Sequence, residues 1–548
     1  MQTRSAAILS HDWFHLAVGF ACVSAASIAC AQDFDAAGTW PTFAGNNARN
    51  AISRHALPSL SEVAWTLQQH AGLPITWLPQ ATPVLSATHV FAVGSTQAVG
   101  GPREFALFCV SRNTGTVAWR GVLPQAPILE SQSSAALDFA NGTALVAAGN
   151  TLAAFDLATG AQRWSTTSPQ PFVNASPLVT DDLGPRDRVF ITTYSPGPAP
   201  GELLCINVDP FDASANPWQP GDLVWSVALG NTSGNTPAML PRRLGGSSLV
   251  VVSTIGDAGI TPGAIIAFDA SSLVAPTPAW TFTNTRPQGF FGGCTIAVGA
   301  SGSLEVVAAS YAFSGGVTSA NTVRLDARTG VLLAETPTNR TNANPIVLPT
   351  QRIALATGIS GFGSAPSLLW LDSSLGPAAM LWHAARDTWI DADGDGRYDA
   401  GEYLRLSGYN TQPAASIFAG RTRLLVPTMQ PSGTTINTGE SLSIVDPSLT
   451  PVQPGFVAQS VTLAGGSVAL AGANAYSIGS AGLVAFGPVP ARFDVNTDSH
   501  RNLDDLYAWE AGSGQRDVDN DGVVTAADRD ALRALLRSDE PRIMEEQR

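Results

Sequence analysis

A short hairpin pattern recurs along most of this chain. It consists of an apolar run, an Asp or Ser, a turn that contains Gly, and a return run that ends in Trp. The clearest copies are residues 152–164 (LAAFDLATGAQRW) and 108–119 (FCVSRNTGTVAW), and residues 326–330 and 372–376 keep the same step from Asp to Gly. Internal repetition strongly constrains the fold, because each unit must bury its apolar face against its neighbours.

Weaker copies bring the number of repeats to eight. They lie at residues 203–225, 265–280 and 442–446, and a last apolar run at 483–486 has no return strand after it. Each copy predicts a β-hairpin in which Gly accepts a positive φ and the Asp or Ser accepts N–H bonds from its own turn. The copies are about 40–75 residues apart, close to the length of one four-stranded propeller blade. The recurrent Trp is interpreted as a packing residue, and a ligand-stacking role stays open.

These repeats resemble those of pyrroloquinoline-quinone-type (quinoprotein-like) β-propellers, which have eight blades and a D-x-x-T-G-x-x-x-W hairpin. Residues 39–49 (TWPTFAGNNAR) are also similar to the opening segment of such domains. The resemblance covers about residues 38–490 and implies an all-β, eight-bladed propeller. Residues 61–67 (SEVAWTL) would then supply the return strand that is missing after Phe486 and close the ring. Seven blades remain an alternative, because the copies near Asp326 and Asp446 lack Trp.

The first 31 residues have the pattern of a secretory signal peptide. Arg4 precedes an apolar stretch at residues 16–28, and Ala29-Cys30-Ala31 predicts cleavage before Gln32. The stretch is too short for a permanent transmembrane helix, which needs about 20 residues. We therefore expect a protein that is secreted, extracellular or periplasmic, without a transmembrane anchor. A buried N-terminal helix and a lipoprotein modified at Cys30 are the weaker alternatives.

Charge and cysteine content exclude some functions. The 548 residues carry a formal net charge of −14, and the 29 basic residues are all arginine. Nucleic acid is therefore not an expected partner, and Schiff-base catalysis by lysine is impossible. Signal cleavage would leave Cys109, Cys205 and Cys294, which are interpreted as buried apolar residues. At most one disulfide bond is possible among them, and the spacing does not say which.

Two calcium-loop patterns occur near the C-terminus. Calcium prefers six to eight oxygen ligands in a flexible loop, supplied at loop positions 1, 3, 5, 7, 9 and 12. At position 7 the backbone carbonyl is the donor, so the residue type there is free. The first loop has Ser499 where the usual turn Gly is expected, which makes its affinity the weaker one. The predicted ligands are Asp494, Asn496, Asp498, His500, Asn502 and Asp505 in the first loop and Asp517, Asp519, Asp521, Val523, Thr525 and Asp528 in the second.

A helix is predicted after each of these loops. The first covers residues 503–509, and Thr525 with Asp528 forms a capping box for the second, whose apolar face contains Leu532, Leu535 and Leu536. Two loop–helix units within residues 491–540 resemble a type I dockerin, which implies a cohesin-like partner. A purely structural calcium-binding tail is the alternative, and residues 541–548 form a polar end. In either case we expect folding of this module to depend on calcium.

A third calcium loop is predicted inside the propeller. Residues 389–390 before it and 403–406 after it are read as strands, so the loop would sit at a hairpin tip within an insertion at 389–406 and make it rigid. A solvated acidic turn without metal is the alternative. The expected ligands are Asp391, Asp393, Asp395, Arg397 through its carbonyl, Asp399 and Glu402.

The sequence shows no catalytic constellation. The chain has no Cys-Cys pair, which the resembled quinone dehydrogenases carry beside their cofactor, and no G-x-S-x-G or H-E-x-x-H motif. We therefore expect calcium but not pyrroloquinoline quinone as a cofactor. The favoured hypothesis is a secreted, non-catalytic scaffold that binds a protein or glycan. The alternative is a secreted enzyme, either a quinone-dependent dehydrogenase or a component that processes polysaccharide.

Overall fold

The computed structural model describes residues 38–127, 133–195, 199–256, 262–312, 319–358, 365–399, 401–407, 411–432, 435–488, 495, 503–514, 516, 518, 524–530 and 532–533. The predicted signal peptide and the polar end at 541–548 lie outside these residues. None of the described helices is both long and apolar enough to cross a membrane.

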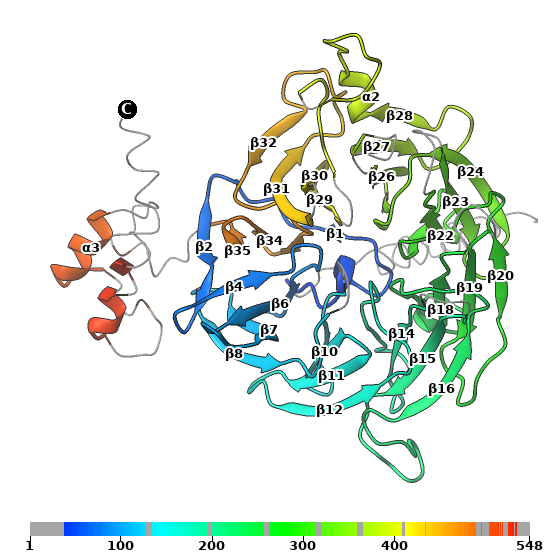
Figure 1. Cartoon of the computed structure of the whole chain (residues 1–548), viewed down its shortest axis with the longest axis horizontal. Helices are drawn as coiled ribbons and strands as arrows, with labels where there is room; N and C mark the ends of the chain where they lie inside the picture. The colour runs from blue at the N-terminus through cyan, green and yellow to red at the C-terminus, as the bar shows by residue number, and fades with distance from the viewer. Residues whose placement is uncertain are drawn as a thin grey trace, which may run out of the picture.

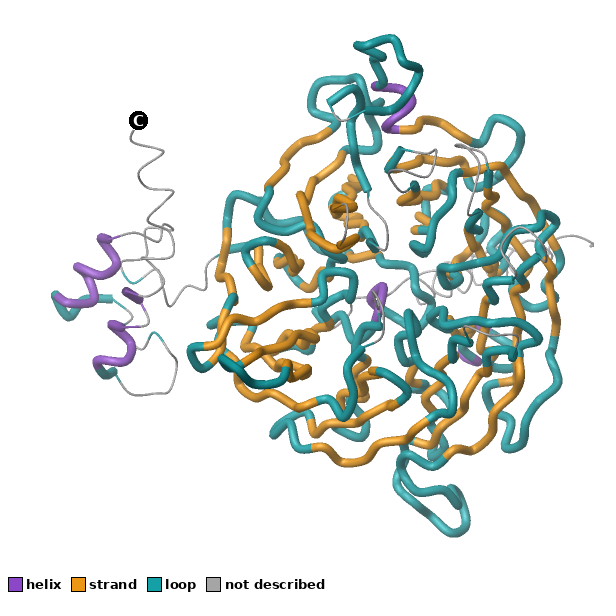
Figure 2. Tube along the Cα trace, viewed as in Figure 1, coloured by secondary structure: helices purple, strands orange, loops and turns teal. Residues whose placement is uncertain are grey.

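The described strands form eight sheets arranged around a central axis, which we call the hub (Figure 1). This confirms the predicted eight-bladed propeller. Strands near the hub are buried on both faces, as in Thr143–Ala148 and Leu249–Ser253, which explains their continuous apolar runs. Figure 2 shows that helices are confined to the hub, the rim and the C-terminal region.

We number the blades from 1 to 8 along the chain. Blade 1 contains β3 (Gln69–His70), β4 (Leu73–Trp77), β5 (Val84–Leu85), β6 (His89–Gln97), β7 (Arg103–Ser111) and β8 (Val117–Val122); blade 2 contains β9 (Ala136–Asp138), β10 (Thr143–Ala148), β11 (Thr151–Asp156) and β12 (Gln162–Thr167); blade 3 contains β13 (Leu178–Val179), β14 (Arg188–Thr192), β15 (Glu202–Asn207) and β16 (Leu223–Ala228); blade 4 contains β17 (Ala238–Leu240), β18 (Leu249–Ser253), β19 (Ala264–Asp269) and β20 (Trp280–Thr283).

Blade 5 contains β21 (Thr295–Val298), β22 (Leu304–Ala309), β23 (Ala320–Asp326) and β24 (Leu332–Thr338); blade 6 contains β25 (Ile346–Leu348), β26 (Arg352–Thr357), β27 (Ser367–Asp372) and β28 (Met380–His383); blade 7 contains β1 (Ile52–Ser53), β29 (Ala414–Phe418), β30 (Arg421–Ser432), β31 (Thr435–Val445) and β32 (Val457–Val461); blade 8 contains β2 (Val63–Leu67), β33 (Ala469–Ala471), β34 (Asn474–Gly479) and β35 (Gly482–Phe486). The labelled helices of the described residues are η1 (Phe43–Gly45), η2 (Arg242–Leu244), α2 (Ala384–Thr388) and α3 (Leu503–Glu510), and residues 526–530 are also helical.

The ring is closed by the N-terminal strand that the sequence predicts. Strand β2 pairs antiparallel with β35, and Trp65 lies opposite Ala485 while Leu67 lies opposite Leu483. The outer strand of blade 8 therefore comes from the start of the chain, and the other three come from its end. Closure in this way leaves no open sheet edge between the first and last blades.

Where the motif carries its Trp, this residue packs one blade against the next. The Trp65 ring lies so close to Gly115 that a Cβ on that residue would be 2.7 Å from ring atoms, and Trp119 has the same relation to Gly160. The indole Nε1 of Trp65 donates to the Arg112 carbonyl over 2.8 Å. The Gly of the motif thus has two tasks: it adopts a positive φ, and it leaves room for the Trp of the preceding blade. The packing interpretation of Trp is confirmed for these blades.

Residues 40–51, which we call the hub segment, run around the central axis and bond to the blades in order. The contacts are Trp40 with Leu85 in blade 1, Pro41 with Leu137 in blade 2, Asn47 with Val179 in blade 3 and with Met239 in blade 4, Ala48 with Ile296 in blade 5, Asn50 with Val347 in blade 6, and Ala51 with Ala415 in blade 7. Strand β1 then pairs in parallel with β29. The hub segment therefore joins seven blades at the centre of the ring.

Arg49 anchors the hub segment. Its side chain is fully buried and donates to the carbonyls of Pro237 over 2.8 Å and Phe43 over 3.0 Å, and to Thr42 Oγ1 over 2.7 Å. Burial lowers the pKa of Arg49 to about 9, so the guanidinium is still charged at neutral pH. A buried cation of this kind is tolerated because oxygen atoms replace its hydration shell.

A polar belt joins the segments that precede the inner strands. Each member accepts a hydrogen bond from, or donates one to, the equivalent segment of the next blade. The links are Thr82 N to Ser134 Oγ (2.8 Å), Ser134 N to Ser176 Oγ (2.9 Å), Ser176 N to Thr236 Oγ1 (3.0 Å), Gly293 N to Asn344 Oδ1 (3.1 Å), Asn344 N to Gln412 Oε1 (2.8 Å), Gln412 N to Ser467 Oγ (3.0 Å) and Ser467 Oγ to the Gln80 carbonyl (2.7 Å).

Candidate calcium sites and the hub cavity

The predicted propeller loop, residues 389–406, lies at the rim after blade 6. Its flanks are not strands, which corrects the prediction. The short helix α2 ends at Thr388, and residues 389–390 and 403–406 have no regular structure. These flanks are too short to pair as β-strands. Two isolated hydrogen bonds close the loop instead: Ile390 N donates to the Glu402 carbonyl over 2.8 Å, and Leu404 N donates to Thr388 Oγ1 over 2.8 Å.

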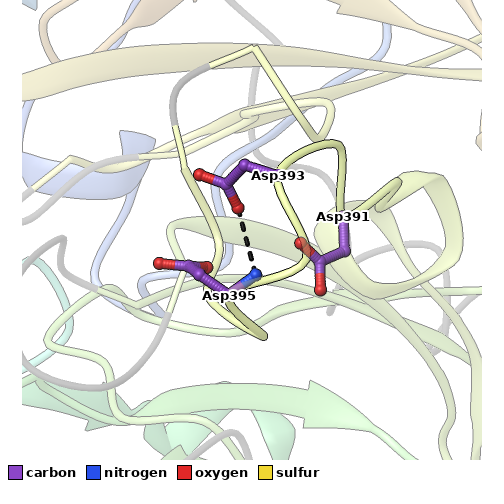
Figure 3. A group of neighbouring side chains, drawn as sticks. All are labelled: Asp391, Asp393 and Asp395. Atoms are coloured by element: carbon purple, nitrogen blue, oxygen red, sulfur yellow. Dashed lines mark hydrogen bonds between the residues drawn. The ribbon is translucent and has the colours of Figure 1, made fainter.

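The carboxylates of Asp391, Asp393 and Asp395 gather around one turn of this loop (Figure 3). Each supplies one oxygen within 4.8 Å of the others, and no other such group occurs among the described residues. Asp391 accepts the N–H bonds of Gly394 over 2.8 Å and Gly396 over 3.0 Å. Both glycines have a positive φ, which lets the loop turn tightly enough to bring the acids together. The arrangement is suited to a hard cation such as calcium.

Glu402 lies at the end of the loop and faces back to its start. Its Oε1 accepts from Ala392 N over 2.8 Å, and its Oε2 accepts from Asp399 N and Trp389 Nε1, both over 3.3 Å. The bond from Ala392 N is the main reason why the pKa of Glu402 is lowered. The pKa of Asp399 is raised, first by desolvation and then by the negative charges of Asp395, Asp393 and Glu402. A bound cation would relieve this repulsion.

The Arg397 carbonyl, predicted to be a ligand, accepts a bond from Trp389 Nε1 over 3.0 Å. A carbonyl has two lone pairs, so this bond leaves one for a metal. Trp389 stacks on Tyr398 with ring centroids 4.5 Å apart, and Tyr398 meets Tyr403 edge to face. These rings form an aromatic base that holds the acidic loop in place.

The C-terminal module is described in part. Its predicted ligands Asp494, Asn496, Asp498, His500, Asn502, Asp517, Asp519, Asp521 and Val523 lie outside the described residues, as do Leu535 and Leu536.

The described part of this module contains the first predicted helix and a part of the second. Helix α3 covers Leu503–Glu510, and residues 526–530 are helical. The capping box is formed: Thr525 N donates to Asp528 Oδ2 over 2.6 Å, and Ala527 N donates to Thr525 Oγ1 over 3.1 Å. Asp528 also accepts from Val518 N over 2.6 Å. Asp505 and Asp528, the residues at loop position 12, are both fully buried.

A small apolar core holds this module together. It consists of Val495, Trp509, Val518 and Leu532, and it is separate from the clusters of the ring. Val495 and Val518 occupy the same position in the two loops, and Trp509 and Leu532 occupy the same position in the two helices. The duplication seen in the sequence therefore extends to the packing.

The hub contains a cavity of about 350 Å³, which we call the hub cavity. It lies between residues 39–48 and the ends of the inner strands of blades 2 to 5. Three acids line it, Asp138, Asp181 and Asp187, and none of its described lining residues is basic. Phe139, which is 51% exposed, also lines it. The lining of this cavity could not be predicted from the sequence, because its walls come from segments that are far apart in the chain.

We compared these sites with the needs of the quinone that propellers of this type bind in dehydrogenases. Pyrroloquinoline quinone carries three carboxylates, so a matching site needs cationic or N–H donors. The acidic hub cavity does not fit such a group. The three described cysteines are free and buried in blades 1, 3 and 5. Burial raises the pKa of Cys109 and of Cys294 to about 12, so these thiols are not nucleophiles at neutral pH.

Comparison with known proteins supports the fold. A family described as outer membrane protein assembly factor BamB matches residues 62–210. A europium-containing methanol dehydrogenase superposes with a TM-score of 0.52 at 13% identity, over 82% of this chain and 90% of that chain. The fold is the eight-bladed quinoprotein-like propeller. BamB from Moraxella catarrhalis gives a TM-score of 0.48 at 15% identity, over 77% of this chain and 96% of that chain. No curated protein matches the chain in sequence.

The calcium-loop pattern at the rim, residues 389–406, which we call the rim loop, gives a direct prediction. Replacing Asp391 by Asn removes one carboxylate oxygen while it keeps an acceptor for the turn, so we expect calcium affinity at this loop to fall by about tenfold or more. Isothermal titration of the full chain with calcium measures this. Asp212→Asn is the matched control, since Asp212 also accepts N–H bonds in its own turn but belongs to no such acidic group. If Asp391→Asn and Asp212→Asn gave the same calcium isotherm, the rim site would be disproved.

Proposed function

We propose that the chain is a secreted, non-catalytic propeller that binds a protein or glycan and is attached by a calcium-dependent, dockerin-like tail to a cohesin-like protein or another surface component. The observation that carries the scaffold role is the hub segment. Residues 40–51 occupy the centre of the ring and bond to seven blades, so this part of the hub is used to hold the ring rigid. A rigid ring that presents loops at both ends suits a binding platform.

The C-terminal module supports attachment to a partner. Its two loop–helix units have their own core, and α3 lies outside the ring (Figure 1). Exposed apolar side chains on and beside these helices, Leu503, Tyr507 and Val524, offer a surface for a partner. The duplicated arrangement is the feature that resembles a type I dockerin.

Secretion is part of the proposal. It rests on the signal-peptide pattern at residues 1–31 and on three calcium-loop patterns. Extracellular modules use calcium sites of modest affinity, because calcium is abundant outside the cell. The expected calcium sites would therefore be filled there.

A quinone-dependent dehydrogenase is the alternative, favoured by the fold shared with the methanol dehydrogenase. Against it stand the acidic lining of the hub cavity and the three separate, buried cysteines. Fold alone does not determine activity, since one propeller architecture serves many functions.

Two measurements test the proposal. The full chain should bind immobilised type I cohesins in calcium and be released by a chelator, and a chain that ends at residue 490 should not bind. Failure to bind any cohesin or surface component would refute the attachment. Oxidation of alcohols above background by the chain reconstituted with quinone and calcium, in a dye-linked assay, would refute the non-catalytic role.

A further inference from the structure

His383 is buried at the point where blade 6 ends and helix α2 begins. It is the last residue of β28, and it is 1% exposed. Its Nδ1 accepts a hydrogen bond from Arg386 N over 3.1 Å and so caps the first turn of α2. The Ser367 hydroxyl lies 2.9 Å from the same nitrogen and accepts from Ala385 N over 3.0 Å. His383 and Ser367 therefore hold the start of α2 against blade 6.

These contacts need a neutral imidazole. Because Nδ1 of His383 accepts from Arg386 N, it carries no proton, and the hydrogen of the neutral imidazole is on Nε2. Nε2 is buried and has no hydrogen-bond partner among the described residues. A second proton would occupy the lone pair of Nδ1 that the Arg386 N–H uses. Protonation of His383 therefore breaks the cap of α2, and it places a positive charge in a buried site.

The surroundings of His383 oppose its protonation. Burial lowers the pKa of His383 to about 4, and the charge of Arg386 adds to this effect while that of Asp387 acts against it. Asp387 accepts from His383 N over 2.9 Å and from Arg386 Nε over 2.6 Å. Burial acts to raise the pKa of Asp387, but these bonds outweigh it and the pKa is lowered. Asp387 therefore stays charged in mild acid. From β27, the group that faces the imidazole is the neutral Ser367 hydroxyl.

The other end of α2 holds the rim loop closed. Thr388 is the last residue of α2, and its hydroxyl donates to the Ala384 carbonyl over 2.7 Å while it accepts from Leu404 N over 2.8 Å. A helix of five residues is not stable by itself and depends on contacts of this kind. Loss of the cap at His383 therefore also loosens the bond that closes the loop at Leu404.

From these contacts we propose that His383 is a pH-sensitive latch, which holds α2 and the rim loop closed while its imidazole is neutral and releases both in mild acid. The latch involves neither the tail nor a ligand of the propeller, so it goes beyond the proposed function.

The sign of the pH effect follows from linkage. When α2 opens, His383 is exposed to water, where a histidine has a pKa of about 6.5. Opening then takes up a proton at any pH between about 6.5 and the lowered pKa of about 4 in the closed state. The closed state therefore has its full stability above about pH 6.5 and loses stability as the pH falls through this window.

Amide hydrogen exchange of the full chain tests the latch. The measurement is made in a chelator, so that calcium does not contribute. We expect the protection of the Arg386 and Leu404 amides, corrected for intrinsic exchange, to fall about 20- to 30-fold between about pH 7.5 and 5, because opening increases by up to about tenfold per pH unit below 6.5. The amides of β10 should keep their protection. Leu404 reports on the coupling, since its N–H is bonded to Thr388 and not to His383.

His383→Asn separates the latch from other effects of acid. The Asn Oδ1 can replace Nδ1 as the acceptor for Arg386 N, and Asn is a preferred N-cap, but it does not titrate. The protection of α2 in this variant should change by less than about threefold over the same pH range. His70→Asn is the matched control, since His70 is a partly exposed histidine of blade 1. It should respond to pH as the unaltered chain does.

Thr388→Val tests the coupling between α2 and the loop. Valine has a similar shape but no hydroxyl, so Leu404 N should exchange fast at both pH values while Arg386 N keeps its pH response. Three results would each overturn the proposal: an equal fall in protection in His383→Asn and in the unaltered chain, no fall in the unaltered chain, or a fall at Arg386 that leaves Leu404 protected.

Discussion

Replacement of Arg49 by methionine is expected to lower the free energy of unfolding of the propeller by about 2–4 kcal/mol. Arg49 donates hydrogen bonds to the carbonyls of Pro237 and Phe43 and to the hydroxyl of Thr42, all of them at the centre of the ring. Methionine fills a similar volume and removes the unfavourable burial of a cation. It also leaves these buried oxygens without hydrogen-bond donors. The cost of several lost hydrogen bonds exceeds the gain from removing the buried charge.

Urea-induced unfolding in excess calcium measures this effect. Arg54→Met is the matched control, because Arg54 lies on the same N-terminal segment and is exposed. A surface substitution of that kind changes stability by less than about 0.5 kcal/mol. Equal unfolding midpoints for the two variants would show that Arg49 does not anchor the ring.

The repeat pattern was sufficient to predict the ring. Runs such as residues 152–155 are apolar at every position because both faces of an inner strand are buried between blades, and this property can be read locally. The missing return strand after Phe486 could also be predicted, because a closed ring needs a partner for β35 and residues 61–67 matched the motif. Periodicity and closure are therefore the parts of the fold that the sequence encodes most directly.

The hub could not be predicted in the same way. The hub segment is fixed by a few hydrogen bonds to each of seven blades, and such contacts over long sequence distances leave no periodic pattern. One signal was present for the polar belt: a polar residue stands shortly before the inner strand in several blades, as in Ser176-Pro177, Thr236-Pro237 and Gln412-Pro413. Proline has no N–H to donate, so a side chain next to it is well placed to link blades.

The rim loop shows which features of a site can be predicted from residues that are neighbours in the sequence. The spacing of Asp391, Asp393 and Asp395 predicted their convergence, because alternate residues of a tight loop point to one side. The flanks were wrongly read as strands, because Trp389 and Tyr403 are also typical of strands. Here these rings instead pack with Tyr398 beneath the loop.

Removal of calcium is expected to unfold the C-terminal module while the ring stays folded. Four side chains form its core, and a domain of about 50 residues buries so little of its surface on folding that its stability is marginal. Asp505 and Asp528 are fully buried at loop position 12, and a buried carboxylate needs a cation or several donors to be stable. If calcium supplies that charge, its binding free energy becomes folding free energy.

Hydrogen exchange of the full chain, with calcium and with a chelator, measures this coupling. We expect the amides of α3 to exchange about a hundredfold faster or more without calcium, and those of β10 to be unchanged. Asp528→Ala should speed up amide exchange in the second helix even in calcium, because it removes both a predicted ligand and the acceptor for Thr525 N. Asp530→Ala, a change at a neighbouring exposed acid, should not. Equal protection of α3 with and without calcium would mean that its apolar core suffices for folding, and the tail would then lose its role as a calcium-dependent attachment.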